Sequence, residues 1–241
     1  MVIQNNYQNA SFLNSTNRVT GSILESYNNV SDYFVLKKAN QLLVEENIEL
    51  RKQLEESFRV VDTNSYFQKD SLFEYIGAKV IRNTINRQKN YLFINKGLKH
   101  GIRQDMGVIT SQGVVGTVVE VSDNYSRIMS VLHSQNKINA RIKKNRHLGN
   151  MEWNGKNYSL GTLTDIPNHV QLYAGDTIVT SGNSLLFPEG IAIGTVENYQ
   201  TSNQEKFSNA SVKYSVDFNK VFYVYIIVNL MEEELNSIEE K

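Results

Sequence analysis

The feature that most constrains this 241-residue chain is a series of short runs rich in Val, Ile, Tyr, Phe and Thr that begins near Ile76. The runs are separated by Gly, Asn, Asp and Ser, an alternation typical of β-strands and turns. Within residues 113–122 both alternating faces are largely apolar, as expected for a strand inside a closed barrel or a sandwich. The runs fall into two similar sets, so we predict two tandem small six-stranded β-barrels at residues 76–146 and 147–230. Exchange of strands between the two units stays open.

Two local signals refine this prediction. Asn154-Gly155 is a dipeptide typical of type I′ turns and predicts a tight hairpin between Trp153 and Tyr158. The longest apolar run, residues 221–228, predicts a buried strand. If the edge of this final strand is exposed, it would allow copies of the chain to assemble into filaments.

A heptad pattern precedes the β region. Leucines recur every seven residues at one position, and two asparagines and a leucine recur at the same interval four residues later. We therefore predict a dimerising coiled-coil helix at residues 33–61, with d positions at the first set and a positions at the second. The predicted seam consists of Tyr33, Leu36, Asn40, Leu43, Asn47, Leu50 and Leu54.

Asparagine at a positions favours a parallel, in-register dimer, because two amides bond each other across the seam. The alternative is a single amphipathic helix that packs on its own globular domain, which normally has a wider apolar stripe. The other segments are a weakly helical lead at residues 1–32, a linker at 62–75 and an acidic tail at 231–241.

The composition argues against several classes of function. Lys plus Arg equal Asp plus Glu at 25 each, so no excess of positive charge suggests a nucleic-acid partner. The chain has no cysteine, and its histidines (100, 133, 147 and 169) lack metal-binding spacing. Phosphate-loop and nucleophile motifs are also missing, and Ser184 lacks the surroundings of a serine nucleophile. We therefore predict no catalytic, cofactor-binding or metal site.

Two further features have a plain and a functional interpretation. The basic cluster at residues 143–147 falls where the two predicted barrels meet, and is either a solvated loop or a contact for anionic lipid or an acidic partner. Trp153, the one tryptophan, either packs in a core or hairpin or stacks on a sugar ring. In both cases the plain structural interpretation is favoured.

Turn motifs carry a resemblance to a known family. The chain resembles the MreC family of rod shape-determining proteins in the order and spacing of Gly97, Gly101, Gly107, Gly113 and Gly116, and again of Gly175, Gly182, Phe187, Pro188, Gly190 and Gly194. The family usually has Pro where Ala192 stands. The segment Glu45–Arg51 is similar to the family's coiled coil, so the resemblance covers roughly residues 33–230. We expect these glycines and the proline to be turn residues that need φ above zero or a fixed φ.

The resemblance implies a non-catalytic, dimeric scaffold of the cell-elongation machinery. Such a protein would contact MreD, RodA and its class B transpeptidase, and would link peptidoglycan synthesis to cytoplasmic MreB. It would lie on the periplasmic face of the inner membrane behind one N-terminal transmembrane helix. No run of about 18 apolar residues occurs in this chain, so we expect a soluble piece that lacks the anchor.

Two rival functions stay open. One is a periplasmic adaptor of a transport complex, which needs an antiparallel helical hairpin with β segments on both sides. This chain has one heptad segment, and its β-like sequence comes only after that segment. The other is a two-barrel serine hydrolase, which needs His, Asp and Ser side chains brought together. Labelling by a fluorophosphonate would reveal the hydrolase.

Overall fold

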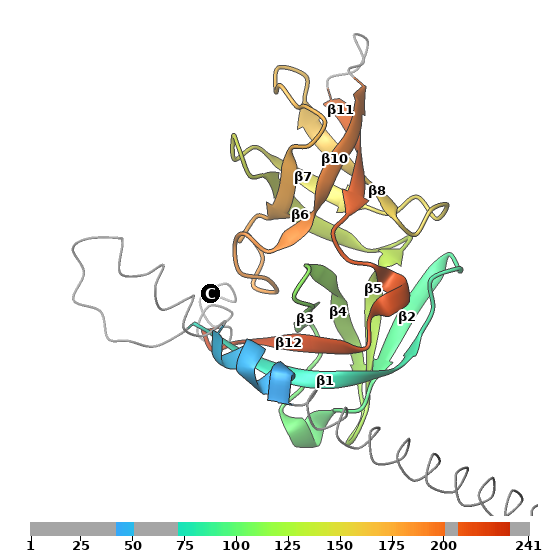
Figure 1. Ribbon diagram of the computed structural model, residues 1–241, viewed down its shortest axis with the longest axis vertical. Coiled ribbons are helices and arrows are strands. Elements are labelled where there is room, and N and C mark those ends of the chain that lie inside the picture. The colour runs from blue at the N-terminus through green and yellow to red at the C-terminus, as the bar shows by residue number, and fades with distance from the viewer. Residues whose placement is uncertain (1–41, 51–71, 201–206, 232–241) are drawn as a thin grey trace, which may run out of the picture. The chain divides into compact units, whose positions relative to one another are not determined.

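The computed structural model describes residues 42–50, 72–200 and 207–231. The chain divides into two units, Met1–Glu46 and Asn47–Lys241, and every described strand belongs to the second unit. Twelve strands form two closed six-stranded barrels (Figure 1). This confirms the predicted fold class of a mainly β chain with two six-stranded barrels.

The first barrel is closed in the strand order β1-β12-β3-β4-β5-β2, with every neighbouring pair antiparallel. Its strands are β1 (Phe73–Asn83), β2 (Lys89–Ile94), β3 (Gly107–Ile109), β4 (Val114–Val121), β5 (Ser126–His133) and β12 (Tyr223–Asn229). A short 3₁₀ helix, η1 (Leu98–His100), follows β2, and another, η2 (Phe218–Lys220), precedes β12. Apolar side chains that alternate along the strands fill the interior, among them Leu92, Ile94, Ile128, Val224 and Ile226.

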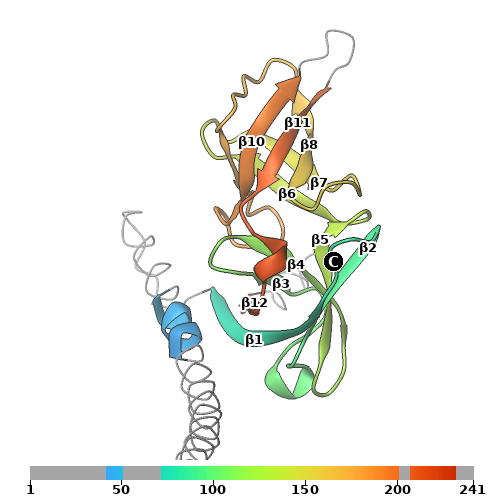
Figure 2. The ribbon, with the colours of Figure 1, turned by 45° about the vertical axis from the view of Figure 1, so that its right-hand side comes forward.

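The second barrel is closed in the order β10-β11-β8-β7-β6-β9 (Figure 2). Its strands are β6 (Lys137–Ile142), β7 (Leu148–Glu152), β8 (Leu160–Pro167), β9 (Thr177–Thr180), β10 (Ala192–Gln200) and β11 (Phe207–Tyr214). Burial alternates strictly along β11, as expected for a strand with one face in a core. Tyr214 is buried; burial raises the pKa of its hydroxyl, and its ring meets that of Phe218 edge to face.

The barrels are not consecutive segments, so the predicted boundaries at 76–146 and 147–230 are wrong. Strand β6 lies before residue 146 but pairs with β7 and β9 of the second barrel. Strand β12 lies at the end of the chain but pairs with β1 and β3 of the first. Hydrophobic periodicity shows which residues form strands, but pairing depends on contacts between residues far apart in the chain. The linker prediction changes too, because β1 begins at Phe73 within residues 62–75.

The final strand is not an exposed edge. Strand β12 pairs with β1 along seven residues, from Tyr223 to Asn229, and with β3 on its other side. A closed barrel has no free edge, so the suggested assembly of filaments through this strand is wrong. Contacts with other molecules must therefore use outward-facing side chains and loops.

The predicted hairpin between Trp153 and Tyr158 is confirmed, because β7 pairs antiparallel with β8, but its type I′ turn at Asn154-Gly155 is wrong. Strand β7 ends at Glu152 and β8 begins at Leu160, so a longer loop joins them. Gly155 has φ of 78°, but Asn154 does not, whereas a type I′ turn needs positive φ at both residues. The Trp153 indole N–H donates to the Asn157 carbonyl at 2.8 Å and closes the loop instead.

Residues 42–50 are helical, in agreement with the predicted helix at 33–61, whose other residues lie outside the described ones. The lead segment 1–32 and residues 232–241 of the acidic tail also lie outside them. Among the described residues, no helix has the length and apolar character needed to cross a bilayer.

Candidate interaction site in the β9–β10 loop

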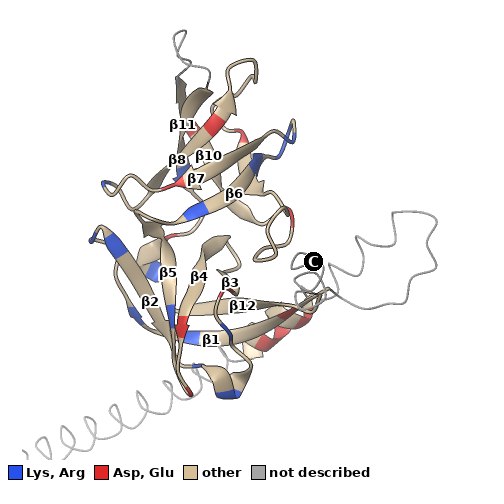
Figure 3. Cartoon of the chain, turned by 180° about the vertical axis from the view of Figure 1, so that it is seen from behind, with Lys and Arg blue, Asp and Glu red and all other residues tan. Residues whose placement is uncertain are grey.

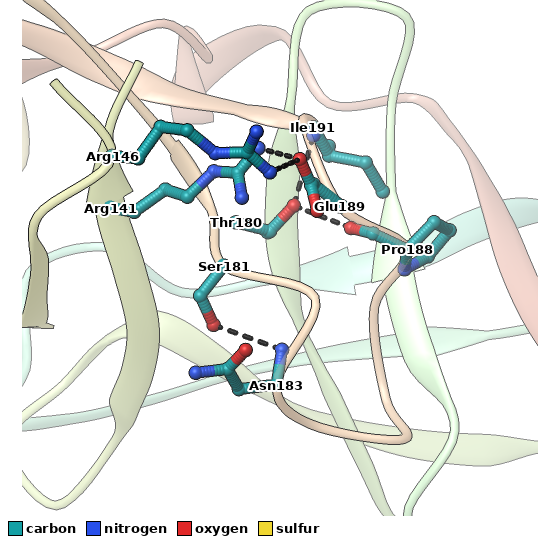
Figure 4. Close-up of polar contacts among 8 residues, drawn as sticks. All are labelled: Arg141, Arg146, Thr180, Ser181, Asn183, Pro188, Glu189 and Ile191. Atoms are coloured by element: carbon teal, nitrogen blue, oxygen red, sulfur yellow. Dashed lines mark hydrogen bonds and ion pairs between the residues drawn. The ribbon is translucent and has the colours of Figure 1, made fainter. Parts of the chain in front are cut away.

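Four of the family motif residues, Gly182, Phe187, Pro188 and Gly190, lie in the loop between β9 and β10, residues 181–191; Figure 4 shows part of this loop. Thr180, at the end of β9, is 1% exposed and holds the two ends of this loop together. Its hydroxyl donates to the Pro188 carbonyl at 2.6 Å and accepts from the Ile191 N–H at 2.9 Å. Backbone bonds from Thr180 to Ile191 and from Gly190 to Thr180 complete the closure. The loop is therefore fixed by its base, independently of any ligand.

Two arginines of the β6 region converge on Glu189 of this loop. Arg141 and Arg146 both form ion pairs with the Glu189 carboxylate (Figure 4). Arg141 is largely buried, and burial, followed by the charge of Arg146, lowers the pKa of its guanidinium. Since Arg146 and Glu189 are exposed, their pair contributes little to stability, whereas the buried Arg141 needs the carboxylate as a partner.

Two glycines allow the path of this loop. Gly182 and Gly190 have φ of 77° and 92°, in the left-handed region that favours glycine. At Gly182 a Cβ would also lie 2.8 Å from the Glu189 Cβ. For these two positions the expected turn role is confirmed.

The same loop contacts the first barrel. Phe187 is 3% exposed, and a Cβ placed on Gly107 of β3 would overlap the Leu186 carbonyl and lie 2.8 Å from the Phe187 ring. The Asn229 amide of β12 donates to the Leu185 carbonyl at 3.2 Å. The Phe187-Pro188 motif therefore joins the barrels; it is more than a turn signal.

Removing the Thr180 hydroxyl tests the closure of the loop. We expect Thr180→Val to lower the free energy of unfolding by about 1–3 kcal/mol, because the part-buried Pro188 carbonyl and Ile191 N–H lose their partner. Thr180→Ser keeps the hydroxyl and serves as the control. Urea unfolding followed by circular dichroism measures both, and equal stability of Thr180→Val and wild type would contradict the role given to the hydroxyl.

Several motif glycines have a different role from the one expected. Gly101, Gly113 and Gly175 have positive φ, as expected, but Gly97, Gly107, Gly116 and Gly194 do not. The last three lie within strands. A Cβ on Gly116 would overlap the Met129 carbonyl of β5, and one on Gly194 the Lys213 carbonyl of β11. These glycines allow close approach of neighbouring strands, so the prediction that all are turn residues is wrong.

A hollow of about 290 Å³, lined by both polar and apolar residues, lies beside the loop. Its lining includes Ser181 and Asn183 of the loop and Asn139, Asn150 and Asp165 of the neighbouring strands. The Asn150 amide donates to the Asp165 carboxylate at 2.8 Å, so the carboxylate is held in place. Amide, hydroxyl and carboxylate groups of this kind suit hydrogen bonding to a polar surface, and they contain no nucleophile–base pair.

Three seam residues, Leu43, Asn47 and Leu50, lie on the described helix, and Tyr33, Leu36, Asn40 and Leu54 lie outside the described residues. The three are spaced four and three residues apart and so share one helix face. Leu43 and Leu50 are 53% and 49% exposed. The dimer seam stays a prediction.

The histidines do not form a catalytic or metal-binding group in the part that the structure describes. His147 and His169 have ring centres 5.8 Å apart, without a third ligand among the described residues. His100 accepts a bond from the Gly97 N–H through Nδ1. Ser184 forms no hydrogen bond with a histidine within residues 72–200 and 207–231. The described residues therefore contain no Ser–His–Asp triad.

His133 makes stability depend on pH. It is fully buried, and its Nδ1 accepts from the Gln135 N–H at 3.1 Å, so Nε2 carries the proton and donates to the Tyr91 hydroxyl at 3.1 Å. Burial, and then the charge of Lys89, lower the pKa of His133 below its ordinary 6.5. The folded chain thus binds this proton less readily than the unfolded chain, and the stabilisation present above about pH 6.5 is lost as pH falls toward the lowered pKa.

We expect the free energy of unfolding to fall between pH 7 and about pH 5, and His133→Gln to make this decline shallower. Urea unfolding at a series of pH values measures the slope. His100→Gln is the control, because that ring is exposed. A slope unchanged in His133→Gln would contradict the assignment.

The structure decides between the two interpretations of Trp153, whereas a contact of the basic cluster with a partner stays a prediction. Trp153 is 5% exposed, which confirms packing in a core or hairpin over stacking on a sugar. The basic cluster lies between β6 and β7 of the second barrel; the expectation that it lies where the barrels meet is wrong. Lys144 lies over the Tyr173 ring at 5.3 Å, and Arg146 pairs with Glu189. The sequence analysis did not identify Thr180, Arg141 and Glu189 as residues that hold the β9–β10 loop. Thr180 ends a strand and Arg141 pairs with a residue far away in the chain, and neither arrangement has a recognisable sequence motif.

Comparisons with known proteins point to one family. The model of the rod shape-determining protein MreC, barrel core, matches residues 80–228. The cell shape-determining protein MreC of Listeria monocytogenes is 26% identical over 163 residues, which are 66% of this chain and 55% of that protein. The chain thus spans about half the length of this curated relative.

Solved structures share the fold. The structure of MreC from Listeria monocytogenes has a TM-score of 0.62 at 24% identity, covering 80% of this chain and 92% of that one. MreC from Helicobacter pylori, solved in complex with the penicillin-binding protein PBP2, has a TM-score of 0.55 at 15% identity, covering 66% and 99%. Because the barrel-core model spans both barrels and the loop that joins them, this chain belongs to the MreC family of rod shape-determining proteins.

Proposed function

We propose that this chain is a non-catalytic scaffold of the cell-elongation machinery that organises peptidoglycan synthases through protein–protein contacts. The observation that carries the proposal is that the motif-rich β9–β10 loop joins two closed barrels and contains no reactive constellation. Membership of a cell shape-determining family supports it. The two joined barrels would present their outward-facing side chains to partners at fixed positions.

The scaffold would act as a parallel dimer through residues 33–61. Two copies of the barrel pair then offer each partner a bivalent surface, and modest contacts gain avidity through effective concentration. In the longer protein, an N-terminal transmembrane helix would hold this assembly at the periplasmic face of the inner membrane.

The partners follow from the family. The Helicobacter pylori relative was solved in complex with PBP2, which supports a class B transpeptidase as a partner of this chain. We extend the proposal to MreD and to the glycosyltransferase RodA. None of these contacts requires a cofactor or nucleic acid.

Direct binding tests the proposal. The chain is mixed at micromolar concentration with the purified periplasmic part of the class B transpeptidase from the same organism, and the mass is measured by light scattering after gel filtration. We expect a complex whose mass is the sum of its components. This chain on its own should show no transpeptidase turnover. Separate elution of the two proteins at every concentration would refute the scaffold with respect to this partner.

A further inference from the structure

A row of alternating arginine and aromatic side chains crosses the outer face of the first barrel. Arg82 of β1 lies opposite Phe93 of β2, Phe93 opposite Arg127 of β5, and Arg127 opposite Glu120 of β4. The Arg82 guanidinium carbon is 5.9 Å from the centre of the Phe93 ring, and that of Arg127 is 4.8 Å from the centre of the Tyr91 ring. We call Arg82, Lys89, Tyr91, Phe93 and Arg127 the arginine–aromatic face.

These side chains point outward, away from the barrel core. Along β2 the half-buried Tyr91 and Phe93 alternate with the fully buried Leu92 and Ile94, which places the two rings on the outside. Cation–π contacts of this kind hold large side chains in place before any partner arrives. Less conformational entropy is then lost when a partner binds.

A hollow of about 280 Å³ opens at one end of the row. Phe93, Arg127, Glu120, Val121 and Tyr125 are among its lining residues, and Tyr125 is 53% exposed. The Nε atom of Arg127 is buried without a hydrogen-bond partner among the described residues. The hollow therefore has aromatic walls on which an apolar side chain would pack, and its lining includes an arginine of the row.

The face carries an excess of positive charge. Figure 3 shows basic residues on β1, β2 and β5. Arg127 is paired with Glu120, whereas the exposed Arg82, Arg87 and Lys89 form no ion pair with any described residue. The charge of Lys89 also contributes to the lowered pKa of the adjacent His133, in keeping with a local positive potential.

We propose that the arginine–aromatic face binds an acidic segment of a partner protein, with carboxylates at Arg82 and Lys89 and an apolar or aromatic side chain in the hollow. Arginine and aromatic residues are enriched in the centres of protein interfaces and among residues that dominate binding energy. Strand addition is not available to a closed barrel, so recognition must come from side chains such as these.

A protein segment fits this face better than a membrane or a nucleic acid. Glu120 lies in the row itself and would repel a continuous anionic surface, but it leaves room for a peptide that places its carboxylates on one side only. The half-buried rings of Tyr91 and Phe93 likewise suit a side chain rather than a layer of head groups. The proposal deepens the scaffold function and rests on it only for the identity of the partner, since binding of an acidic peptide is measured directly.

The test uses the whole chain and a fluorescein-labelled peptide, Glu-Glu-Phe-Glu-Glu-Leu, followed by fluorescence anisotropy. We expect Arg82→Glu combined with Lys89→Glu to weaken binding at least about tenfold, and Phe93→Ala to weaken it about fivefold. Added salt should also weaken binding to the wild type. A peptide with Lys in place of each Glu should not bind. Circular dichroism melting establishes that each variant is folded.

The matched control carries the same change of charge on the second barrel, Lys143→Glu with Lys213→Glu, and should bind like the wild type. Equal weakening in this control, or equal binding of the Lys peptide, would overturn the proposal. So would vesicles of phosphatidylcholine and phosphatidylserine that bind through Arg82 and Lys89 while the peptide does not. If the wild type does not bind the acidic peptide but still forms the transpeptidase complex, this face is refuted and the scaffold function stands.

Discussion

Replacing Phe187 with alanine is expected to lower the free energy of unfolding by about 3–5 kcal/mol, as is usual for a buried phenylalanine. The ring is 3% exposed and packs against Gly107, so its loss leaves a cavity between the β9–β10 loop and strand β3. Since these two elements belong to different barrels, the variant should weaken both barrels together. Urea unfolding followed by circular dichroism gives the change in free energy.

Phe222→Ala is the matched control. Phe222 is 65% exposed, so the same chemical change there should cost no more than about 0.5 kcal/mol. Amide spectra by NMR add a local measure, since the Gly107 and Gly116 signals should shift in Phe187→Ala and stay in place in Phe222→Ala. If both variants lost the same small amount of stability, the loop would not join the barrels in the way described.

This prediction changes how the family motif is understood. Gly182, Phe187, Pro188 and Gly190 are used to build one loop, and that loop is anchored by Thr180 at its base and by Gly107 and Asn229 at its tip. The motif residues therefore build a fixed junction between the two barrels. Such a junction is useful to a scaffold, which needs no reactive group.

The strands were predictable because most have a local signature. Runs of β-branched and aromatic residues bounded by Gly, Asn and Asp mark most of the described strands, although β7 contains neither residue type. Their partners were not predictable, because β6 and β12 resemble the other strands in composition and differ only in which distant strands they meet. The boundaries at 146 and 147 failed for this reason.

The sites show the same division between local and distant information. The Gly182 and Gly190 turns were expected from sequence because the conformation is a property of the residue itself. Gly107 and Gly116 were placed in turns, since a single sequence does not show which carbonyl will approach them. The arginine–aromatic face joins three strands and has no signature along the chain.

The second large effect concerns the heptad seam. We expect the wild-type chain to be a dimer in solution and the double variant Leu43→Ala, Leu50→Ala to be a folded monomer. Both leucines are about half exposed on the described helix and occupy d positions, where a second helix would cover them. Removing four leucine side chains per dimer costs roughly 6 kcal/mol or more, which raises the dissociation constant by about four orders of magnitude.

Leu42 provides the control, because it lies on the same helix, is 57% exposed and falls outside the a and d positions. Leu42→Ala should therefore stay dimeric, and all three proteins should keep the same β signal in circular dichroism. Light scattering decides between the alternatives, because a monomeric wild type would mean that the helix packs in cis and that bivalent binding must be abandoned. A dimer that survives in the double variant would instead place the interface elsewhere, and with the barrels closed it would have to use their outward-facing side chains.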